Sequence, residues 1–134
     1  MAMTKTRLYL RPTGLPDTDR SMGYSYGIRV GDTIWVSGQV AKNERGDIVG
    51  GSDPAAQAEQ CFRNIATILG EGGATLDDVV QLNIFIKDAS MGPHVQRVRK
   101  QTFKDGEWPT AVIVVAEAIR PEYLVEIQAV AVVE

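Results

Sequence analysis

Glu126 is the most suggestive ionisable residue of this chain, because it stands in an otherwise aliphatic stretch that reads as the last strand. Strand alternation places it on one face with Leu124, Gln128, Val130 and Val132. A carboxylate among aliphatic side chains is costly unless it is hydrogen-bonded or lies in a wet cleft. Glu126 is therefore either a structural residue, bonded to backbone or to a neighbouring subunit, or a group that orients water and moves protons.

Two short segments beside the first expected strands carry further candidates. Tyr24 and Tyr26 precede the first main strand, where tyrosines either pack half-buried or form the wall of a small-molecule pocket. Gly38 lies at the end of the second strand, and a glycine there indicates a bulge or the close approach of a ligand.

Other reactive residue types are isolated in the sequence. His94 is the only histidine and reads as a surface residue at the start of a helix. Cys61 is the only cysteine; it reads as a core residue rather than a nucleophile, and a lone thiol fits a reducing compartment. The sequence has no metal-ligand spacing, phosphate loop or nucleophile elbow, so we expect no metal and no cofactor.

The elements that must position these residues follow from hydrophobic periodicity and turn residues. The first helix begins with Asp53 as N-cap and ends at Gly72-Gly73, and a second helix opens at Pro93. Arg11 to Met22 reads as an irregular loop. Strands are expected at Ile28–Val30, Thr33–Val40, Val79–Lys87, Ala111–Ala118 and Tyr123–Val133, with Asp47–Gly50 as an optional short one. This order predicts an α+β fold, a mixed β-sheet with two helices packed on one face.

Composition narrows the class of protein. With 134 residues, the chain is expected to form one domain over 1–134. The net charge is -3 and no basic patch is visible, which argues against a nucleic-acid partner. Met1 to Leu10 reads as neither signal peptide nor anchor, and no apolar run approaches the roughly 18 residues of a membrane span. We expect a cytoplasmic protein without a membrane partner.

The last two expected strands are apolar on both faces, at Ala111–Val115 and Val130–Val133. A small sheet with helices on one side only normally has a polar second face. Another subunit is the simplest cover for such a face, so we expect a closed homo-oligomer.

Three segments in this order and spacing are similar to those of a known family. They are RVGDTIWVSGQ at 29–39, the segment from Ala66 onward with its GGATLDDVVQLNIFIKD core at 72–88, and LVEIQAV at 124–130. Together they resemble the RidA family, also called YjgF or L-PSP, over nearly the whole chain from Tyr24 onward. The resemblance implies a chorismate-mutase-like subunit, assembled as a homotrimer with small-molecule clefts between subunits.

The resemblance also implies a chemistry and a set of site residues. Deaminating members hydrolyse a 2-imino acid to the 2-oxo acid and ammonia without metal or organic cofactor. By residue-for-residue match, Glu126 corresponds to the glutamate that holds the attacking water. Tyr24 corresponds to a tyrosine that shapes the pocket, and Gly38 to a glycine of its wall.

One residue departs strongly from the family pattern. Where the family has the arginine that binds the substrate carboxylate, this chain has Ala111, preceded by Thr110. A guanidinium grips a carboxylate through two parallel hydrogen bonds, and a methyl group cannot. Arg99, in the second helix, is one candidate for a replacement cation, whereas Arg120 reads as a turn residue.

Three functions remain open from the sequence. The first is a divergent member that hydrolyses an imine, enamine or related small metabolite, similar to a 2-iminobutanoate/2-iminopropanoate deaminase. Glu126 would position water, and Tyr24 and the Thr110 hydroxyl would bind substrate. The second is a non-catalytic trimer that binds a small molecule. The third is an endoribonuclease or translation inhibitor, which the acidic charge balance disfavours.

Overall fold

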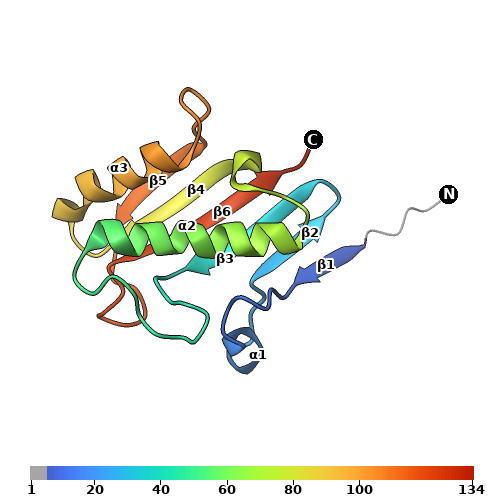
Figure 1. Cartoon of the computed structure of the whole chain (residues 1–134), viewed down its shortest axis with the longest axis horizontal. Helices are drawn as coiled ribbons and strands as arrows, with labels where there is room; N and C mark the ends of the chain where they lie inside the picture. Colours follow the sequence, from blue (N-terminus) through green and yellow to red (C-terminus); the bar gives the residue numbers. More distant parts are fainter. Residues whose placement is uncertain (1–5) are drawn as a thin grey trace.

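The computed structural model describes residues 6–134 and consists of one mixed sheet with two long helices on one side. The strand order in space is β1-β2-β3-β6-β4-β5. The strands are β1 (Arg7–Leu10), β2 (Gly27–Val30), β3 (Thr33–Gln39), β4 (Val79–Ile86), β5 (Thr110–Val115) and β6 (Val125–Val132). Only β4 and β5 pair in parallel, and the predicted α+β fold with a mixed sheet is confirmed (Figure 1).

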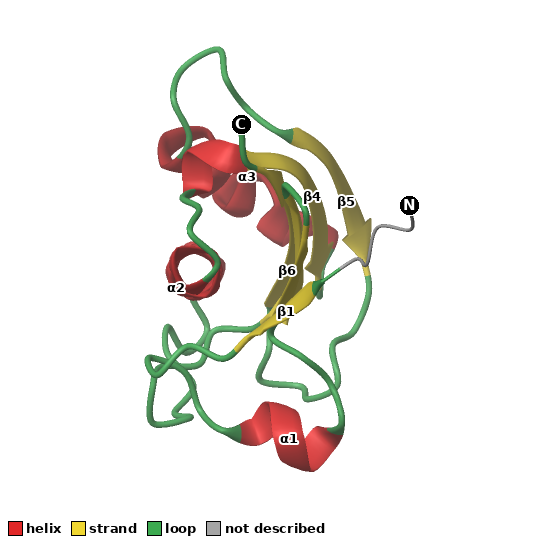
Figure 2. Cartoon of the chain, turned by 90° about the vertical axis from the view of Figure 1, so that its right-hand side faces the viewer, coloured by secondary structure: helices red, strands yellow, loops and turns green. Residues whose placement is uncertain are grey.

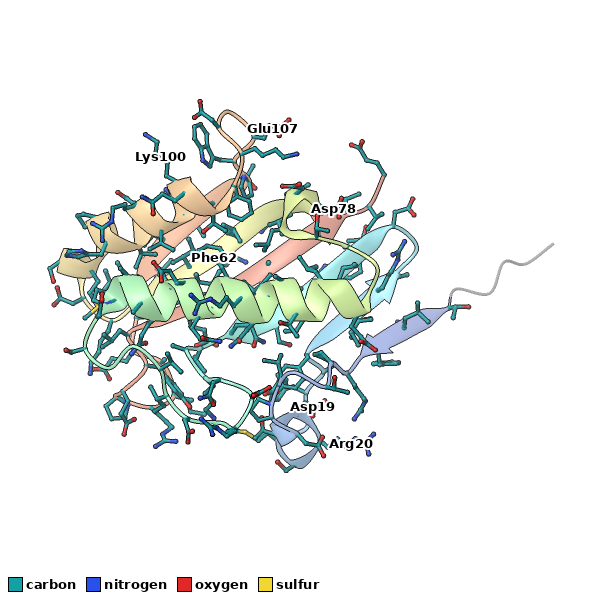
Figure 3. All side chains as sticks on the ribbon, viewed as in Figure 1. Asp19, Arg20, Phe62, Asp78, Lys100 and Glu107 are labelled. Carbon is teal, nitrogen blue, oxygen red and sulfur yellow. The ribbon has the colours of Figure 1, made fainter. Side chains whose placement is uncertain are left out.

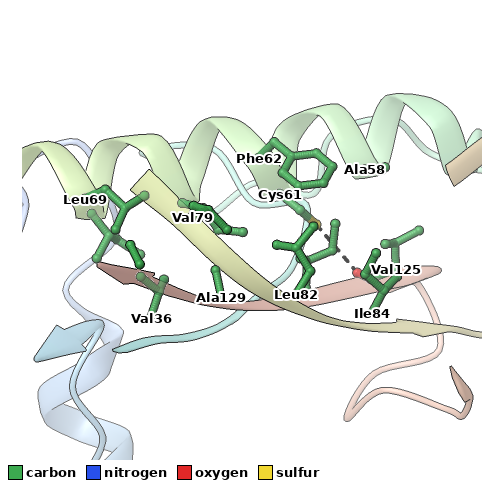
Figure 4. Packing of buried hydrophobic residues seen from close by; sticks show 14 of the residues in the cluster. Val36, Ala58, Cys61, Phe62, Leu69, Val79, Leu82, Ile84, Val125 and Ala129 are labelled. Atoms are coloured by element: carbon green, nitrogen blue, oxygen red, sulfur yellow. Dashed lines mark hydrogen bonds between the residues drawn. The ribbon is translucent and has the colours of Figure 1, made fainter. Parts of the chain in front are cut away.

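Helix α2 (Pro54–Glu71) forms where the sequence predicts it. Asp53 is its N-cap and accepts hydrogen bonds from the backbone N–H groups of Ala55 and Ala56, at 3.0 and 3.4 Å. Gly72 is its C-cap. Its apolar face packs on the sheet, as Figure 4 shows for Cys61, which donates a weak hydrogen bond to the Val125 carbonyl. Burial raises the pKa of the Cys61 thiol, so its interpretation as a core residue is confirmed.

Helix α3 (Gly92–Thr102) lies beside α2 on the same side of the sheet (Figures 1 and 2). Val95 and Val98 are buried against the core. The helix ends at Thr102, because Phe103 turns into extended backbone and packs edge-on against Phe62. Two single-turn helices complete this half, Leu76–Asp78 and Ala89–Met91.

The N-terminal quarter differs from the sequence prediction. Arg11 to Met22 is not all loop, because α1 (Thr18–Met22) closes it with a short helix that ends at Gly23. Within the predicted stretch Met1 to Leu10, residues 1–5 lie outside the described residues, and Arg7–Leu10 form β1 on the edge of the sheet. The optional strand Asp47–Gly50 is reduced to an isolated bridge between Lys42 and Ile48.

One face of the sheet carries no helix in the described part of the chain (Figure 2). Large apolar side chains are exposed there, including Trp35 at 49%, Val112 at 49% and Val114 at 42%. The register places Val112 and Val114 beside Asn83 and Phe85 of β4. We call this surface the open face. It includes the apolar second face that the sequence predicts for the last two strands. None of the helices between residues 6 and 134 is both long and apolar enough to cross a membrane.

Candidate functional site

Glu126 lies on the open face, near the start of β6, where β6 pairs with β4 opposite Phe85. Its neighbours along the strand, Val125 and Ile127, point into the core, as the alternation predicts. The side chain is half-buried, and this burial raises the pKa of its carboxyl above the usual range. A glutamate with a raised pKa takes up a proton more readily, which suits a group that receives one from water.

Gly38 creates the space that the Glu126 carboxylate occupies. The ladder between β3 and β6 is interrupted between Val36 and Gln39, so the backbone of β3 bulges beside Glu126. A Cβ atom added at Gly38 would lie 2.3 Å from Oε1 of Glu126 and 3.0 Å from its Cδ. The sequence singled out Gly38 for a close approach, and the approaching group is Glu126 itself.

Tyr24 reaches the same region from the segment after α1. Its ring packs edge-on against Tyr26, with centroids 5.7 Å apart, and its hydroxyl lies 3.5 Å from the Thr18 hydroxyl. Tyr26 is buried and donates a hydrogen bond to the Pro16 carbonyl, and burial raises its pKa to about 12. Tyr26 is thus a packing residue, whereas Tyr24 remains 39% exposed and can contact a ligand.

These residues line one cavity of about 650 Å³. Tyr24, Gly38 and Glu126 of the expected site residues belong to it. Much of the wall is apolar, from α1, its flanking loops and the segment before β6. A volume of this order is typical of small-molecule sites, so the fold brings part of the expected site together in a pocket of suitable size.

Two cations that the sequence did not point to lie in the wall of this cavity. Arg120 and Lys42 both line it, and both lie over the ring of Tyr123, at 5.8 and 5.6 Å from its centroid. Such contacts between a cation and an aromatic face contribute roughly 0.5–1 kcal/mol at exposed sites. The interpretation of Arg120 as only a turn residue is incomplete, because the turn aims it at the cavity of Glu126.

Two buried amides of α2 hold the segments that carry these cations. Gln57 donates to the carbonyl of Glu122 at 3.0 Å and accepts from the backbone N–H of Leu124 at 2.9 Å. Asn64 donates to the carbonyls of Val40 and Lys42, at 3.1 and 2.9 Å. Gln57 and Asn64 are almost fully buried, so these bonds form away from competing water.

We predict that Gln57→Leu lowers the free energy of unfolding by about 3 kcal/mol, because it leaves buried backbone groups without partners. Besides its two bonds to the segment before β6, Gln57 donates to the Gly51 carbonyl at 2.8 Å. Urea unfolding at neutral pH measures the change. Gln101→Leu, on the exposed side of α3, is the matched control and should change stability little; equal losses in both variants would refute the role of Gln57.

Arg99 and Ala111 lie elsewhere, in a second hollow of about 490 Å³ beside α3. Trp108 forms part of its wall and donates from its ring N–H to the carbonyl of Lys100, which Figure 3 labels near the end of α3. Ala111 is in register with Leu82 of β4, which points into the core, and so it faces the helix side of the sheet. Within one chain, Arg99 therefore does not share the cavity of Glu126.

The Thr110 hydroxyl is already hydrogen-bonded within the sheet. It donates to the Val80 carbonyl at 2.9 Å, and the residue lies outside the lining of both cavities. The expected set thus divides into Tyr24, Gly38 and Glu126 on one side and Arg99 and Ala111 on the other. Among the described residues, no three His, Cys, Asp or Glu side chains cluster as metal ligands would.

Comparison with known proteins relates this geometry to a family. The family model described as Endoribonuclease L-PSP matches residues 17–133. A 2-iminobutanoate/2-iminopropanoate deaminase of Dermatophagoides farinae is 32% identical over 111 residues, 83% of this chain and 86% of the relative. The 3-aminoacrylate deaminase RutC of Acinetobacter baylyi is 31% identical over 108 residues, 81% and 85% of the two chains. The crystal structure of RidA from an Antarctic Psychrobacter superimposes with a TM-score of 0.84 at 28% identity, covering 94% of this chain and 99% of that one.

Proposed function

The chain belongs to the RidA (YjgF/L-PSP) family, and we propose that it hydrolyses the C=N bond of a small imine, or of the imine tautomer of an enamine. The observation that carries the proposal is the half-buried Glu126, held against Gly38 in a cavity of small-molecule size. Two similar proteins are named as deaminases of such compounds, which supports the same reaction class.

In the proposed reaction, Glu126 acts as the base that activates water. The carboxylate accepts a proton from water while the water oxygen bonds to the carbon of a protonated imine, which gives a neutral carbinolamine. Glu126 then returns the proton to the amino nitrogen, the C–N bond breaks, and the hydroxyl proton leaves with ammonia as the carbonyl forms. The net change is one protonated imine and one water to one carbonyl compound and one ammonium ion.

Tyr24 supports this reaction as a wall of the pocket rather than as an acid. Its ring is fixed by the edge-on contact with Tyr26, and its exposed hydroxyl can donate a hydrogen bond to the substrate. These roles of Tyr24 and Glu126 are our proposal for this chain.

The experiment is a coupled assay in which amino-acid oxidase generates 2-imino acids of different size and ammonia release is followed. The proposal expects release faster than the spontaneous rate for at least one imine and saturation with substrate. If no imine is hydrolysed above the spontaneous rate, the deaminase proposal is refuted, and a non-catalytic small-molecule-binding protein becomes the favoured alternative. The net charge of -3 makes RNA cleavage the less favoured activity, and incubation with single-stranded RNA in the same buffer checks it.

We further propose that the protein is a homotrimer formed through the open face. Exposed Trp35 and Val114 would become buried there, and the neighbouring subunit would close the cavity of Glu126. Light scattering should give about 44 kDa, three times the 14.6 kDa of the chain. Val114→Asp should shift the mass toward monomer because it buries an unpaired charge. Gln101→Asp, on α3, should not; a monomeric mass for the unaltered protein would refute the assembly.

A further inference from the structure

A cation favours the binding of a substrate carboxylate in the cavity of Glu126, and the cavity has two that the family match does not assign. We propose that Arg120 binds the carboxylate of the substrate, with Lys42 adding positive potential beside it. With these two cations, the cavity would bind small 2-imino or 2-oxo acids even though Ala111 stands at the position of the family arginine. The inference rests on the proposed function for the identity of the substrate.

The placement of Arg120 carries this inference. Arg120 lies six positions before Glu126, in the turn that leads into β6, and both residues line the same cavity. The backbone N–H of Tyr123 donates to the Arg120 carbonyl at 3.2 Å, which closes the turn. The cavity thus has a positive end at Arg120 and Lys42 and a carboxylate at Glu126. A 2-imino acid matches this arrangement, because its carboxylate would meet the cations while the adjacent imine carbon, which water attacks, would face Glu126.

The turn is rigid enough to define a binding position. Tyr123 is 3% exposed, and its ring lies under both cations. Gln57 fixes the backbone on both sides of Tyr123 through the Glu122 carbonyl and the Leu124 N–H. A cation on a fixed backbone loses less conformational freedom when it binds a ligand, which favours a specific site.

The guanidinium of Arg120 keeps donors free for a carboxylate. Its ion pair joins Nε to the Glu122 carboxylate at 3.5 Å, with both side chains about half exposed. Exposed pairs of this kind contribute little, so Glu122 competes weakly with a ligand. Because this ion pair is made through Nε, the two terminal nitrogens can present the fork that binds carboxylates bidentately.

Within one chain Arg99, one candidate replacement from the sequence, lies apart from the cavity of Glu126. It lines the hollow beside Ala111 on the helix side of the sheet, whereas Glu126 lies on the open face. Within one chain only Arg120 and Lys42 combine a positive charge with the cavity of Glu126. A lysine ammonium is a point charge that cannot form the two parallel bonds of a guanidinium, so Arg120 should contribute more than Lys42.

The test is the affinity of 2-oxobutanoate, measured by titration calorimetry and compared with its neutral amide, 2-oxobutanamide. We expect Arg120→Met to weaken binding of 2-oxobutanoate at least tenfold and to leave the amide unchanged. Lys42→Met should give a smaller loss for the anion. Arg45→Met is the matched control: Arg45 pairs with Asp47 two residues on, as Arg120 does with Glu122, but lies outside the cavity.

Several outcomes would overturn the inference: no binding of 2-oxobutanoate by the unaltered protein, unchanged affinity in Arg120→Met, or a loss in Arg99→Met instead. Circular dichroism of each variant separates loss of the site from loss of the fold. Binding does not depend on turnover, so the two proposals fail separately. Selective anion binding without ammonia release would refute the deaminase proposal and support the Arg120 site. Turnover together with unchanged affinity in Arg120→Met would support the deaminase proposal and refute the Arg120 site.

Discussion

Glu126→Gln should reduce the rate of imine hydrolysis by about 100-fold or more, because an amide cannot accept the proton of the attacking water. Gln keeps the length of the side chain and its place beside Gly38, so the cavity retains its shape. The measurement is ammonia release at saturating imine, with the spontaneous rate subtracted. Glu107→Gln, in the exposed turn before β5, is the matched control and should keep full activity.

The same substitution should stabilise the fold at neutral pH. Burial raises the pKa of Glu126 in the native state, so the native state binds its proton more tightly than the unfolded state does. Stability is therefore lost as pH rises through the titration of this carboxyl, and Gln removes that loss. The melting temperature of Glu126→Gln should exceed that of the unaltered protein at pH 7, and the difference should vanish in acid. An activity loss accompanied by lower stability at pH 7 would instead indicate a structural glutamate.

Gly38→Ala should reduce hydrolysis at least tenfold while the protein stays folded. The new Cβ would lie 2.3 Å from Oε1 of Glu126, closer than any non-bonded contact allows, so the carboxylate must move. The carboxylate is the end of a flexible side chain and can turn aside without moving the backbone. A displacement of about 1 Å at a catalytic group can reduce the rate about 100-fold. The assay is again ammonia release, with circular dichroism to confirm the fold.

Gly70→Ala is the matched control for this substitution. Gly70 lies in α2, and apart from the adjacent backbone of that helix no atom lies within 4 Å of the position of its added Cβ. Alanine there should raise stability by about 1 kcal/mol through helix propensity and leave activity unchanged. If Gly38→Ala retained full activity, the position of the Glu126 carboxylate in the structure would not be the one required for hydrolysis.

The elements with strong local signals were predictable from the sequence. Asp53 and Pro54 define the start of α2 and Gly72 its end, because capping and turn geometry depend on neighbouring residues alone. The alternation around Glu126 also predicted correctly which side chains leave the core. Such features require no knowledge of distant contacts.

The N-terminal elements were missed because their signals are weak. β1 spans Arg7–Leu10, and only its last residue is buried, so no alternation of burial marks it. Its strand conformation depends on pairing with β2 at the edge of the sheet. α1 has only five residues, and Asp17 makes no side-chain hydrogen bond as its N-cap. A helix this short is held by tertiary packing rather than by its own propensity.

The candidate site was half predictable for a related reason. Tyr24, Gly38 and Glu126 were identified from residue type and family resemblance, and they line one cavity. Arg120 was not, because its position depends on Gln57, which is distant in sequence and bonds the backbone around Tyr123. The sequence signal that could have pointed to it is Arg120-Pro121-Glu122-Tyr123, where a guanidinium precedes an aromatic ring by three residues.

A crystal structure of the protein with 2-oxobutanoate bound tests the site most directly. We expect the ligand to occupy the cavity of about 650 Å³, with its carboxylate on the Arg120 guanidinium and its carbonyl carbon facing Glu126. Ligand bound beside Arg99 and Trp108 in the other hollow, with the cavity of Glu126 holding only water, would contradict this expectation.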